Sequence, residues 1–227
     1  MKPERKLAET RSPEGSAVTL YEHDGAYSLR VGHDELMNSL ATASEIVLGE
    51  QASWRGSPEH PHVLIGGLGL GYTLRAALRV VDAEAQVTVV ELLPELVQCN
   101  RILLRGLNGT ALVDARVQVI VGDAVQVLAR SAPASYDAIL LDVDNGPTAM
   151  VQAGNAAIYR APGLGQIVQA LRPGGRVAFW SASVVPSFER QLRRTGLSVQ
   201  VLHARRYAHA RTASCRVYVG EKLRPRR

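Results

Sequence analysis

A glycine-rich segment between two apolar stretches is the strongest constraint on how this chain folds. In VLIGGLGLGYTLRAAL, a β-rich run ends at Ile65, glycines crowd the following turn, and a helical pattern begins at once. Glycine permits a tight turn and a close approach of a ligand to bare backbone, and a helix N-terminus offers unpaired N–H groups. The segment therefore predicts a ligand site, and a glycine-rich packing turn is the structural alternative. The glycines are Gly66, Gly67, Gly69 and Gly71.

Short apolar runs alternate with amphipathic stretches from this segment to the end of the chain. Runs that are rich in Val, Ile and Leu and apolar on both faces are typical of parallel strands covered by helices. The sequence therefore predicts an α/β fold, in which helices cover both faces of a mostly parallel, seven-stranded sheet. The seven runs are HVLIGG, QVTVVE, RVQVIVGD, YDAILLDVD, GGRVAFWSA, LSVQVLHARR and SCRVYVG.

The first part of the chain has a different pattern. Residues 1–16 are polar and are expected to form a frayed lead-in. Two β-rich runs, Val18–Tyr21 and Tyr27–Val31, flank an Asp-Gly pair and predict a small N-terminal β-hairpin. Residues 34–51 place apolar side chains at helical spacing, so a helix is expected there.

Composition limits the class of protein. The 227 residues are 46% apolar and 21% charged, which excludes a disordered or fibrous chain. No run approaches the roughly 18 apolar residues of a membrane span, and the N-terminus lacks a signal-peptide stretch. The two cysteines are too few for a disulfide framework, so a reduced, cytoplasmic protein is expected. We expect an N-terminal part, 1–52, and a Rossmann-like, nucleoside-binding catalytic domain, 53–227.

Acidic residues stand at the ends of the next two predicted strands. Glu91 comes 20 residues after Gly71, where a carboxylate can accept hydrogen bonds from both hydroxyls of a ribose. Asp123 follows Gly122, and it can accept a hydrogen bond from an exocyclic amine such as adenine N6. Each has a structural alternative, because either carboxylate can cap the helix that follows it. With the glycines, these acids predict a ligand that carries an adenosine-like ribose.

Two further aspartates, Asp142 and Asp144, follow the next predicted strand in YDAILLDVDNGP. Ligands of open α/β sheets bind at the carboxyl ends of the strands, so both are expected at the same edge as Glu91. Two carboxylates beside a ligand can hold a cation or take a proton. The alternative is turn chemistry, since Asp-Asn-Gly-Pro strongly favours a turn.

These strand ends, taken in order, resemble those of the spermidine synthase (polyamine aminopropyltransferase) family. The resemblance extends from about Leu20 to Gly220 and includes HDELMNSLATASE, VLIGGLGLG, VTVVELLPELV, RVQVIVGDA and YDAILLDV. It implies the Rossmann-like, class I fold of S-adenosylmethionine-dependent methyltransferases. The hairpin matches the small β-domain that the family often uses in dimerisation, so a homodimer is one assembly that the resemblance implies.

The resemblance also implies roles for individual residues. Glu91 would bind the ribose, the Gly-Asp pair that ends in Asp123 would hold the adenine, and Asp142 would assist attack by the acceptor amine. Asp144 would be a further substrate-binding residue, loosely matched to the family's second aspartate. The donor is a co-substrate, S-adenosylmethionine or its decarboxylated form, and no metal is expected. The expected donor-binding residues are Gly66, Gly67, Gly69, Gly71, Glu91, Leu92, Asp123 and Ala124.

The sequence departs from the family at the amine side of the site. The family's glycine loop usually carries an aspartate that binds the ammonium of the aminopropyl group, and this chain has Gly69 there. That change leaves room for ordinary S-adenosylmethionine. The family's Tyr-His-Glu is replaced by Asn38-Ser39-Leu40. The nucleoside site is therefore expected to match the family better than the acceptor site.

Three functions follow from these observations. We expect a transferase that moves an aminopropyl group from decarboxylated S-adenosylmethionine to an amine acceptor, as in polyamine biosynthesis. The alternative that Gly69 favours is an S-adenosylmethionine-dependent methyltransferase acting on a small molecule. A non-catalytic nucleoside- or RNA-binding protein is a second alternative. A nicotinamide-dependent enzyme is disfavoured, because the G-x-G-x-x-G pattern requires a glycine where Tyr72 stands.

The RNA-binding alternative rests on the C-terminal stretch. From Ser187 onward the chain holds 11 basic and 2 acidic residues. RNA recognition requires aromatic side chains for stacking, and Tyr207 and Tyr218 are the candidates there. The signal is thin, so we expect a small-molecule amine or another small acceptor, and neither a nucleic acid nor a membrane as partner. Trp180, at the end of a predicted strand, either lines the acceptor pocket or belongs to the core.

Overall fold

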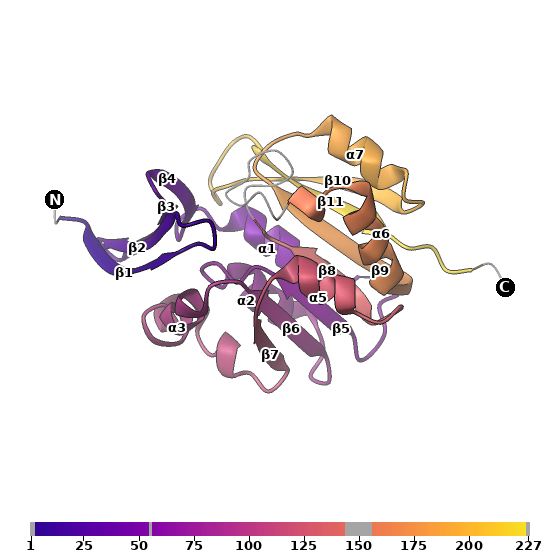
Figure 1. The fold of residues 1–227 in the computed structure, drawn as a ribbon, viewed down its shortest axis with the longest axis horizontal. Helices are drawn as coiled ribbons and strands as arrows, with labels where there is room; N and C mark the ends of the chain where they lie inside the picture. The colour runs from indigo at the N-terminus through magenta and orange to yellow at the C-terminus, as the bar shows by residue number, and fades with distance from the viewer. Residues whose placement is uncertain (1–2, 55, 144–155, 226–227) are drawn as a thin grey trace.

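Two sheets joined by a short helix make up the computed structural model, which describes residues 3–54, 56–143 and 156–225 (Figure 1). The smaller sheet is antiparallel throughout and contains β1 (Arg5–Arg11), β2 (Ala17–His23), β3 (Ala26–Val31) and β4 (Asp34–Asn38), in that order. The predicted hairpin is formed by β2 and β3, whose turn places Asp24 and Gly25 at φ values of 48° and 81°. The hairpin is therefore confirmed as part of a larger, four-stranded sheet.

Two predictions for the N-terminal part are wrong. The polar lead-in forms β1, whose many charged residues suit an edge strand, and Arg5 pairs with Glu22 on β2 at 3.2 Å. The segment 34–51 begins as a strand rather than a helix, because Gly32, at a φ of 59°, allows a tight turn from β3 into β4. Only its second half is helical, as α1 (Ala43–Gly49) and the 3-10 turn Glu50–Ala52.

The larger sheet contains all seven predicted strands. They are β5 (His62–Gly66), β6 (Gln86–Glu91), β7 (Val117–Val121), β8 (Tyr136–Leu141), β9 (Leu171–Ser181), β10 (Ser198–Ala204) and β11 (Cys215–Glu221). Their order across the sheet is β10-β11-β9-β8-β5-β6-β7. The pairs among β5 to β9 are parallel, and β11 runs antiparallel to both of its neighbours. The predicted α/β, Rossmann-like fold is confirmed.

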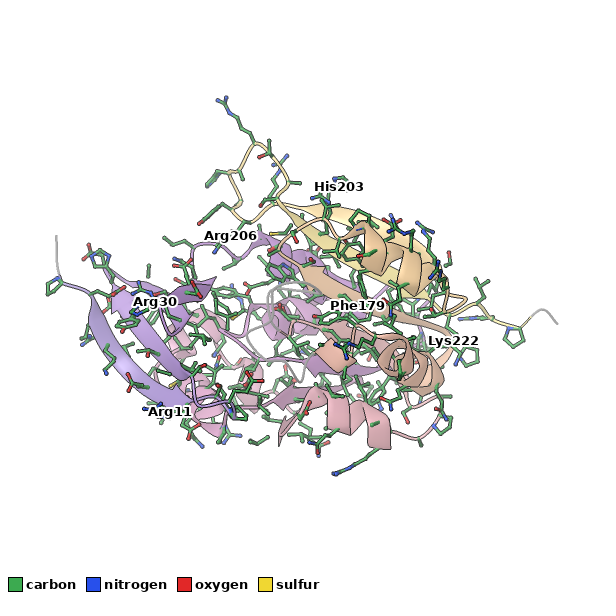
Figure 2. All side chains as sticks on the ribbon, turned by 45° about the horizontal axis from the view of Figure 1, so that its top comes forward. Arg11, Arg30, Phe179, His203, Arg206 and Lys222 are labelled. Carbon is green, nitrogen blue, oxygen red and sulfur yellow. The ribbon has the colours of Figure 1, made fainter. Side chains whose placement is uncertain are left out.

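Helices cover both faces of the larger sheet (Figure 1). One face packs against α1 and α2 (Tyr72–Val80), through Leu48, Leu74 and Ala77. The other face packs against three helices around the buried ring of Phe179, which Figure 2 shows in the interior. Within the described residues, no helix has both the length and the apolar character needed to cross a membrane. The helices of that second face are α5 (Ala124–Arg130), α6 (Ala161–Ala170) and α7 (Pro186–Arg193).

A third apolar cluster joins the smaller sheet to the rest of the molecule. Leu20 and Leu29 from β2 and β3 pack against Leu96 and Cys99 of α3 (Pro94–Ile102). The segment that follows α3 contains α4 (Arg105–Asn108) and a 3-10 turn, Ala111–Val113. The two sheets are thus held together by buried apolar contacts. The proposed division after residue 52 stays a prediction. α1, which lies before that point, contributes Leu48 to the core of the larger sheet.

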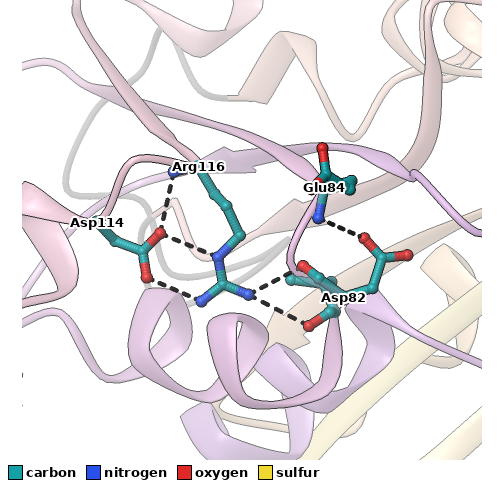
Figure 3. A network of polar contacts seen from close by, with 5 residues as sticks. Asp82, Glu84, Asp114 and Arg116 are labelled. Atoms are coloured by element: carbon teal, nitrogen blue, oxygen red, sulfur yellow. Dashed lines mark hydrogen bonds and ion pairs between the residues drawn. The ribbon is translucent and has the colours of Figure 1, made fainter.

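Charged side chains at the amino end of the larger sheet pair with one another (Figure 3). Arg116, just before β7, donates to the two carboxylate oxygens of Asp114 at 2.9 and 2.8 Å. It also donates to the carbonyl oxygens of Val81 and Asp82 at 3.2 and 3.0 Å, next to the turn that precedes β6. The hydrogen bond from Arg116 lowers the pKa of Asp114. This network ties the starts of two neighbouring strands together.

Candidate active site

A cavity of about 420 Å³ lies at the carboxyl ends of the parallel strands, where the smaller sheet meets the larger one. Its wall is formed by the glycine loop between β5 and α2, the residues that follow β6, β7 and β8, and parts of β4 and α1. Its volume is in the range of small-molecule sites, and its position is that of ligand sites in open α/β sheets. The strand ends singled out in the sequence therefore converge on one cavity.

The glycine loop is shaped by close packing against the chain itself. At Gly67, with a φ of 91°, a Cβ atom would overlap the carbonyl oxygen of Asp142. At Gly71, with a φ of 90°, it would lie 2.9 Å from the Cβ atom of Asn108. Both conformations disfavour any residue with a side chain. Packing therefore explains why glycines stand at these two positions, and Gly67 also brings the loop against the residue that follows β8.

Gly69 faces a side chain from the smaller sheet. A Cβ atom at this position, where φ is 51°, would overlap the Sδ atom of Met37 and lie 2.6 Å from its Cε atom. Met37 therefore occupies the space into which a residue 69 side chain would project. A thioether, and not a carboxylate, stands at this point of the cavity wall.

Glu91 ends β6 with its side chain buried, at 7% exposure. Its Oε2 atom accepts a hydrogen bond from the N–H of Leu68, and its Oε1 atom accepts one from the N–H of Leu93, both at 2.9 Å. Burial raises the pKa of Glu91, and the backbone N–H groups around it oppose that shift. The carboxylate thus holds the glycine loop and the start of α3, and its remaining lone pairs can accept ribose hydroxyls.

Asp123 follows β7 and caps the next helix. Its Oδ1 atom accepts a hydrogen bond from the N–H of Val125 at 2.7 Å, as expected of an N-cap residue of α5. Asp123 also lines the cavity, with Ala124 beside it and Leu92 after Glu91. The structural and ligand-binding interpretations are compatible, because one carboxylate can serve both.

Asp142 comes directly after β8, a strand whose six residues are all buried. Its Oδ2 atom accepts a hydrogen bond from the hydroxyl of Thr73 on α2 at 2.9 Å. Burial raises the pKa of Asp142 to about 6, and the Thr73 hydrogen bond opposes that shift. A carboxylate with this pKa is mostly ionised at neutral pH and can accept a proton there.

Several lining residues were missed by the sequence analysis. Glu45 on α1 is 6% exposed, and Arg206 lies in the loop after β10, near the smaller sheet (Figure 2). The Arg206 guanidinium donates to Glu35 at 3.1 Å. Trp180, left open between pocket and core, lines the cavity and also packs on the core. The one sequence signal for Glu45 is an acid within an otherwise apolar helical segment.

The cavity carries an excess of negative charge. Among the described residues that line it, five are carboxylates and one, Arg206, is a cation. Such a surface favours a cationic ligand, since the field of several carboxylates is concentrated in a partly enclosed site. The five carboxylates are Glu35, Glu45, Glu91, Asp123 and Asp142.

The sequence matches the family model of the spermine/spermidine synthase domain over residues 53–193. The chain belongs to this family. The match covers the glycine loop, the strands β6, β7 and β8 with the acids Glu91, Asp123 and Asp142 at or just after their ends, and the helices between them. It confirms the resemblance on which the site was predicted.

Curated relatives match part of this chain. A polyamine aminopropyltransferase of Mycobacterium tuberculosis is 32% identical over 123 residues, which are 53% of this chain and 23% of the relative. Polyamine aminopropyltransferase 2 of Streptomyces coelicolor is 36% identical over 132 residues, 57% of this chain and 23% of the relative. The matched segments thus cover less than a quarter of each relative.

Solved structures match nearly the whole chain. A spermidine synthase in complex with the transition-state analogue AdoDATO gives a TM-score of 0.73 at 14% identity, over 96% of this chain and 72% of the other. A probable spermidine synthase from Corynebacterium glutamicum gives 0.64 at 18% identity, over 97% and 81%. At these identities the likeness establishes the fold, which is that of spermidine synthases.

Within this family fold, the predicted site residues separate into three groups. Gly66 and Gly71 belong to the glycine loop but are not among the residues that line the cavity. Asp144 lies outside the described residues. The remaining predicted residues line one cavity, and they are Gly67, Gly69, Glu91, Leu92, Asp123, Ala124 and Asp142.

The basic C-terminal stretch is partly used for internal contacts. Lys222 donates to the carbonyl oxygens of Val168 and Leu171 at 2.6 and 2.7 Å, at the end of α6 (Figure 2). Tyr218, one of two aromatic candidates for RNA stacking, is 1% exposed and accepts a hydrogen bond from Val185. The prediction that Tyr218 could stack on RNA bases is therefore wrong. Of the two tyrosines, Tyr207, at 45% exposure, remains a candidate.

Proposed function

We propose that this protein transfers the aminopropyl group of decarboxylated S-adenosylmethionine to an amine acceptor, in cytoplasmic polyamine biosynthesis. The observation that carries the proposal is the acid-rich cavity, which has Glu91, Asp123 and Asp142 at the ends of β6, β7 and β8. A sulfonium donor and a protonated amine are both cations, so both suit such a cavity. Membership of the spermine/spermidine synthase domain family supports the same reaction.

The donor's nucleoside suits the residues on one side of the cavity. Glu91 would accept hydrogen bonds from the ribose hydroxyls, and Asp123 would accept one from the exocyclic amine of adenine. Gly67 leaves the loop backbone free of side-chain bulk. The bound donor supplies a sulfonium leaving group, so the protein contributes mainly by positioning the reactants in line.

Asp142 would take the proton that the acceptor nitrogen loses. The acceptor arrives as an ammonium and first gives one proton to Asp142, which frees the nitrogen lone pair. That lone pair forms the new C–N bond while the C–S bond breaks, and the electrons of the C–S bond stay on sulfur, which leaves as 5′-methylthioadenosine. The proton passes to the Asp142 carboxylate, whose pKa of about 6 lets it accept a proton at neutral pH and return it to solvent. The Thr73 hydroxyl would fix the orientation of that carboxylate.

A second candidate is methyl transfer from intact S-adenosylmethionine to a small molecule. The contact between Gly69 and Met37 favours it, because no carboxylate stands there to repel the donor's own carboxylate. The nucleoside contacts would be the same in both reactions. The two functions differ in which group of the donor is moved and in how its amino-acid end is held.

Calorimetric titration of the purified protein with each donor form tests the proposal. We expect decarboxylated S-adenosylmethionine to bind at least tenfold more tightly than the intact form, which corresponds to about 1.4 kcal/mol. Mass spectrometry after incubation with diamines should then detect the aminopropylated product. A preference for the intact donor, with a methylated product, would replace the first function with the second. Failure to bind either form would exclude both.

A further inference from the structure

Glu45 is a buried acid in the wall of the cavity, and the proposed reaction does not require it. It lies in the first turn of α1, and its side chain is among those that line the cavity. Its exposure is 6%, and within the described part of the chain its Oε2 atom has no hydrogen-bond partner. A buried carboxylate oxygen without a partner is costly, so the fold alone gives no reason to keep an acid here.

The charged and titratable groups around Glu45 come from several elements. Asp142, after β8, adds a second negative charge, and Tyr72 on α2 contributes a phenol. Arg206, from the loop after β10, is the opposing charge, but its guanidinium donates to Glu35. Burial first, and the charge of Asp142 second, raise the pKa of Glu45 well above its usual value. Glu45 and Asp142 thus form a pair of acids that repel each other when both are ionised.

A cation between Glu45 and Asp142 would offset two energetic costs, the unpaired carboxylate oxygen of Glu45 and the repulsion between the two acids. It would give the Oε2 atom of Glu45 a donor, and it would reduce the repulsion between the two carboxylates. In the proposed reaction the ligand that must approach Asp142 is an amine, which arrives protonated at neutral pH. An ammonium group has donors for two carboxylates simultaneously.

We propose that Glu45 is an acceptor-binding residue, which binds the ammonium group of the acceptor amine beside Asp142. This inference rests on the proposed function for the identity of the cation. Glu45 would supply a carboxylate to the amine side of the site, where the sequence departs most from the family. Without ligand, burial and mutual repulsion favour a proton on the acid pair, and binding of the ammonium favours its release.

The test is binding of 1,4-diaminobutane, used as a probe, to the protein saturated with 5′-methylthioadenosine. Calorimetry compares the wild type with Glu45→Gln, which keeps the shape of the side chain but removes its charge. Glu50→Gln is the matched control, because Glu50 is an exposed carboxylate at the end of the same helix. We expect Glu45→Gln to weaken diamine binding at least tenfold, and Glu50→Gln to change it less than twofold.

A second readout separates ligand binding from a structural role. Titrations in buffers of different ionisation enthalpy count the protons released when the diamine binds. We expect proton release in the wild type near pH 6, the pKa of Asp142, and a clearly smaller release in Glu45→Gln, with the affinity for 5′-methylthioadenosine unchanged in both variants. Unchanged diamine affinity in a folded Glu45→Gln variant would overturn the assignment.

Failure of the proposed function is distinguishable from failure of this inference. If the wild type binds 5′-methylthioadenosine but no diamine, Glu45 is not an ammonium site and the nucleoside site stands. If the wild type binds no nucleoside, the proposed function fails, and the diamine titration without nucleoside still decides the role of Glu45. Equal diamine binding by wild type and Glu45→Gln in that titration would reject the inference.

Discussion

Two aspartates, one at the start of β8 and one just after its end, show how differently the two ends of the larger sheet stabilise acidic side chains. At the amino end, Asp137 accepts hydrogen bonds from the backbone N–H of His62 and from the Arg172 guanidinium. At the carboxyl end, Asp142 accepts a hydrogen bond from the uncharged hydroxyl of Thr73, and its negative charge raises the pKa of Glu45. One aspartate is neutralised by the protein, and the other is not.

The same contrast extends across the sheet. Asp114 at the amino end accepts hydrogen bonds from the Nε and Nη2 atoms of Arg116. Glu91 at the carboxyl end accepts from backbone N–H groups, which stabilise a carboxylate without cancelling its charge. Partly buried ion pairs stabilise the carboxylates at the amino end, whereas Glu91 and Asp142 accept hydrogen bonds from uncharged donors, an arrangement that suits a cationic ligand. Under the proposed function, the acids at the amino end of the sheet contribute to stability and those at the carboxyl end contribute to ligand binding.

The largest expected effect is on turnover. Asp142→Asn removes the proton acceptor and should lower kcat by about 10²–10⁴-fold, the usual contribution of a general base. Donor affinity should stay within a few-fold, because the nucleoside contacts are elsewhere. Steady-state rates and donor calorimetry measure the two quantities. Asp137→Asn, the same change near the start of β8, is the matched control, and near-normal turnover by Asp142→Asn would contradict the role of Asp142 as proton acceptor.

The second effect is on folding. Asp137→Asn should lower the free energy of unfolding by roughly 1–3 kcal/mol, because it breaks a charge-assisted hydrogen bond at a site with 5% exposure. Arg172 is partly exposed, which keeps the loss in the lower part of that range. Urea unfolding of wild type, Asp137→Asn and Asp142→Asn at pH 7.5 measures it. Equal destabilisation by both aspartate variants would contradict the inference that the protein neutralises Asp137 but not Asp142.

The pH dependence of stability tests whether the pKa of Asp142 is raised in the folded protein. Its folded-state pKa of about 6 lies above the ordinary value of 3.8, so the folded state binds this proton more tightly. The stability that protonation provides is present below about pH 4 and is lost as pH rises through about 6. Asp142→Asn has no such loss, so its stability relative to wild type should rise between pH 4 and 7, by roughly 1–3 kcal/mol. A constant difference in Tm across this range would show that the Asp142 carboxyl titrates normally.

A smaller effect is expected on donor binding. Glu91→Gln should weaken the binding of either donor form about tenfold, because a neutral amide accepts fewer and weaker hydrogen bonds than a carboxylate. Glu84→Gln makes the same chemical change before the same strand, at an exposed position, and should have no effect. Donor calorimetry on both variants measures the difference. Equal affinities would leave Glu91 with its structural role alone.

The sequence predicts the half of the site that depends on local patterns. Apolar runs and the residues that follow them place Glu91, Asp123 and Asp142 at one sheet edge, because the carboxyl ends of parallel strands lie at the same edge regardless of side-chain packing. The glycine loop is equally local. The roles of Gly67 and Gly71 do not follow from local sequence, because the residues that they pack against lie far away in the chain.

The other half depends on tertiary packing and could not be predicted. The segment that holds Met37 and Glu45 has the apolar spacing of a helix, but Gly32 turns its first part into β4. That strand brings Met37 against Gly69, and the helix after it brings Glu45 to the cavity. Neither contact leaves a periodic signal, so this side of the cavity can be recognised only in the fold.

The smallest expected effect sharpens the difference between donor forms. Gly69→Asp combined with Met37→Ala would place a carboxylate where Met37 now lies, and aspartate tolerates the left-handed φ of 51° better than most residues. Such a carboxylate would attract the ammonium of the decarboxylated donor and repel the carboxylate of intact S-adenosylmethionine. We expect the affinity ratio to shift severalfold toward the decarboxylated form, with Met37→Ala alone as control. Because the site is partly open to solvent, a larger shift is not expected, and no shift would mean that the donor's amino-acid end lies away from Gly69.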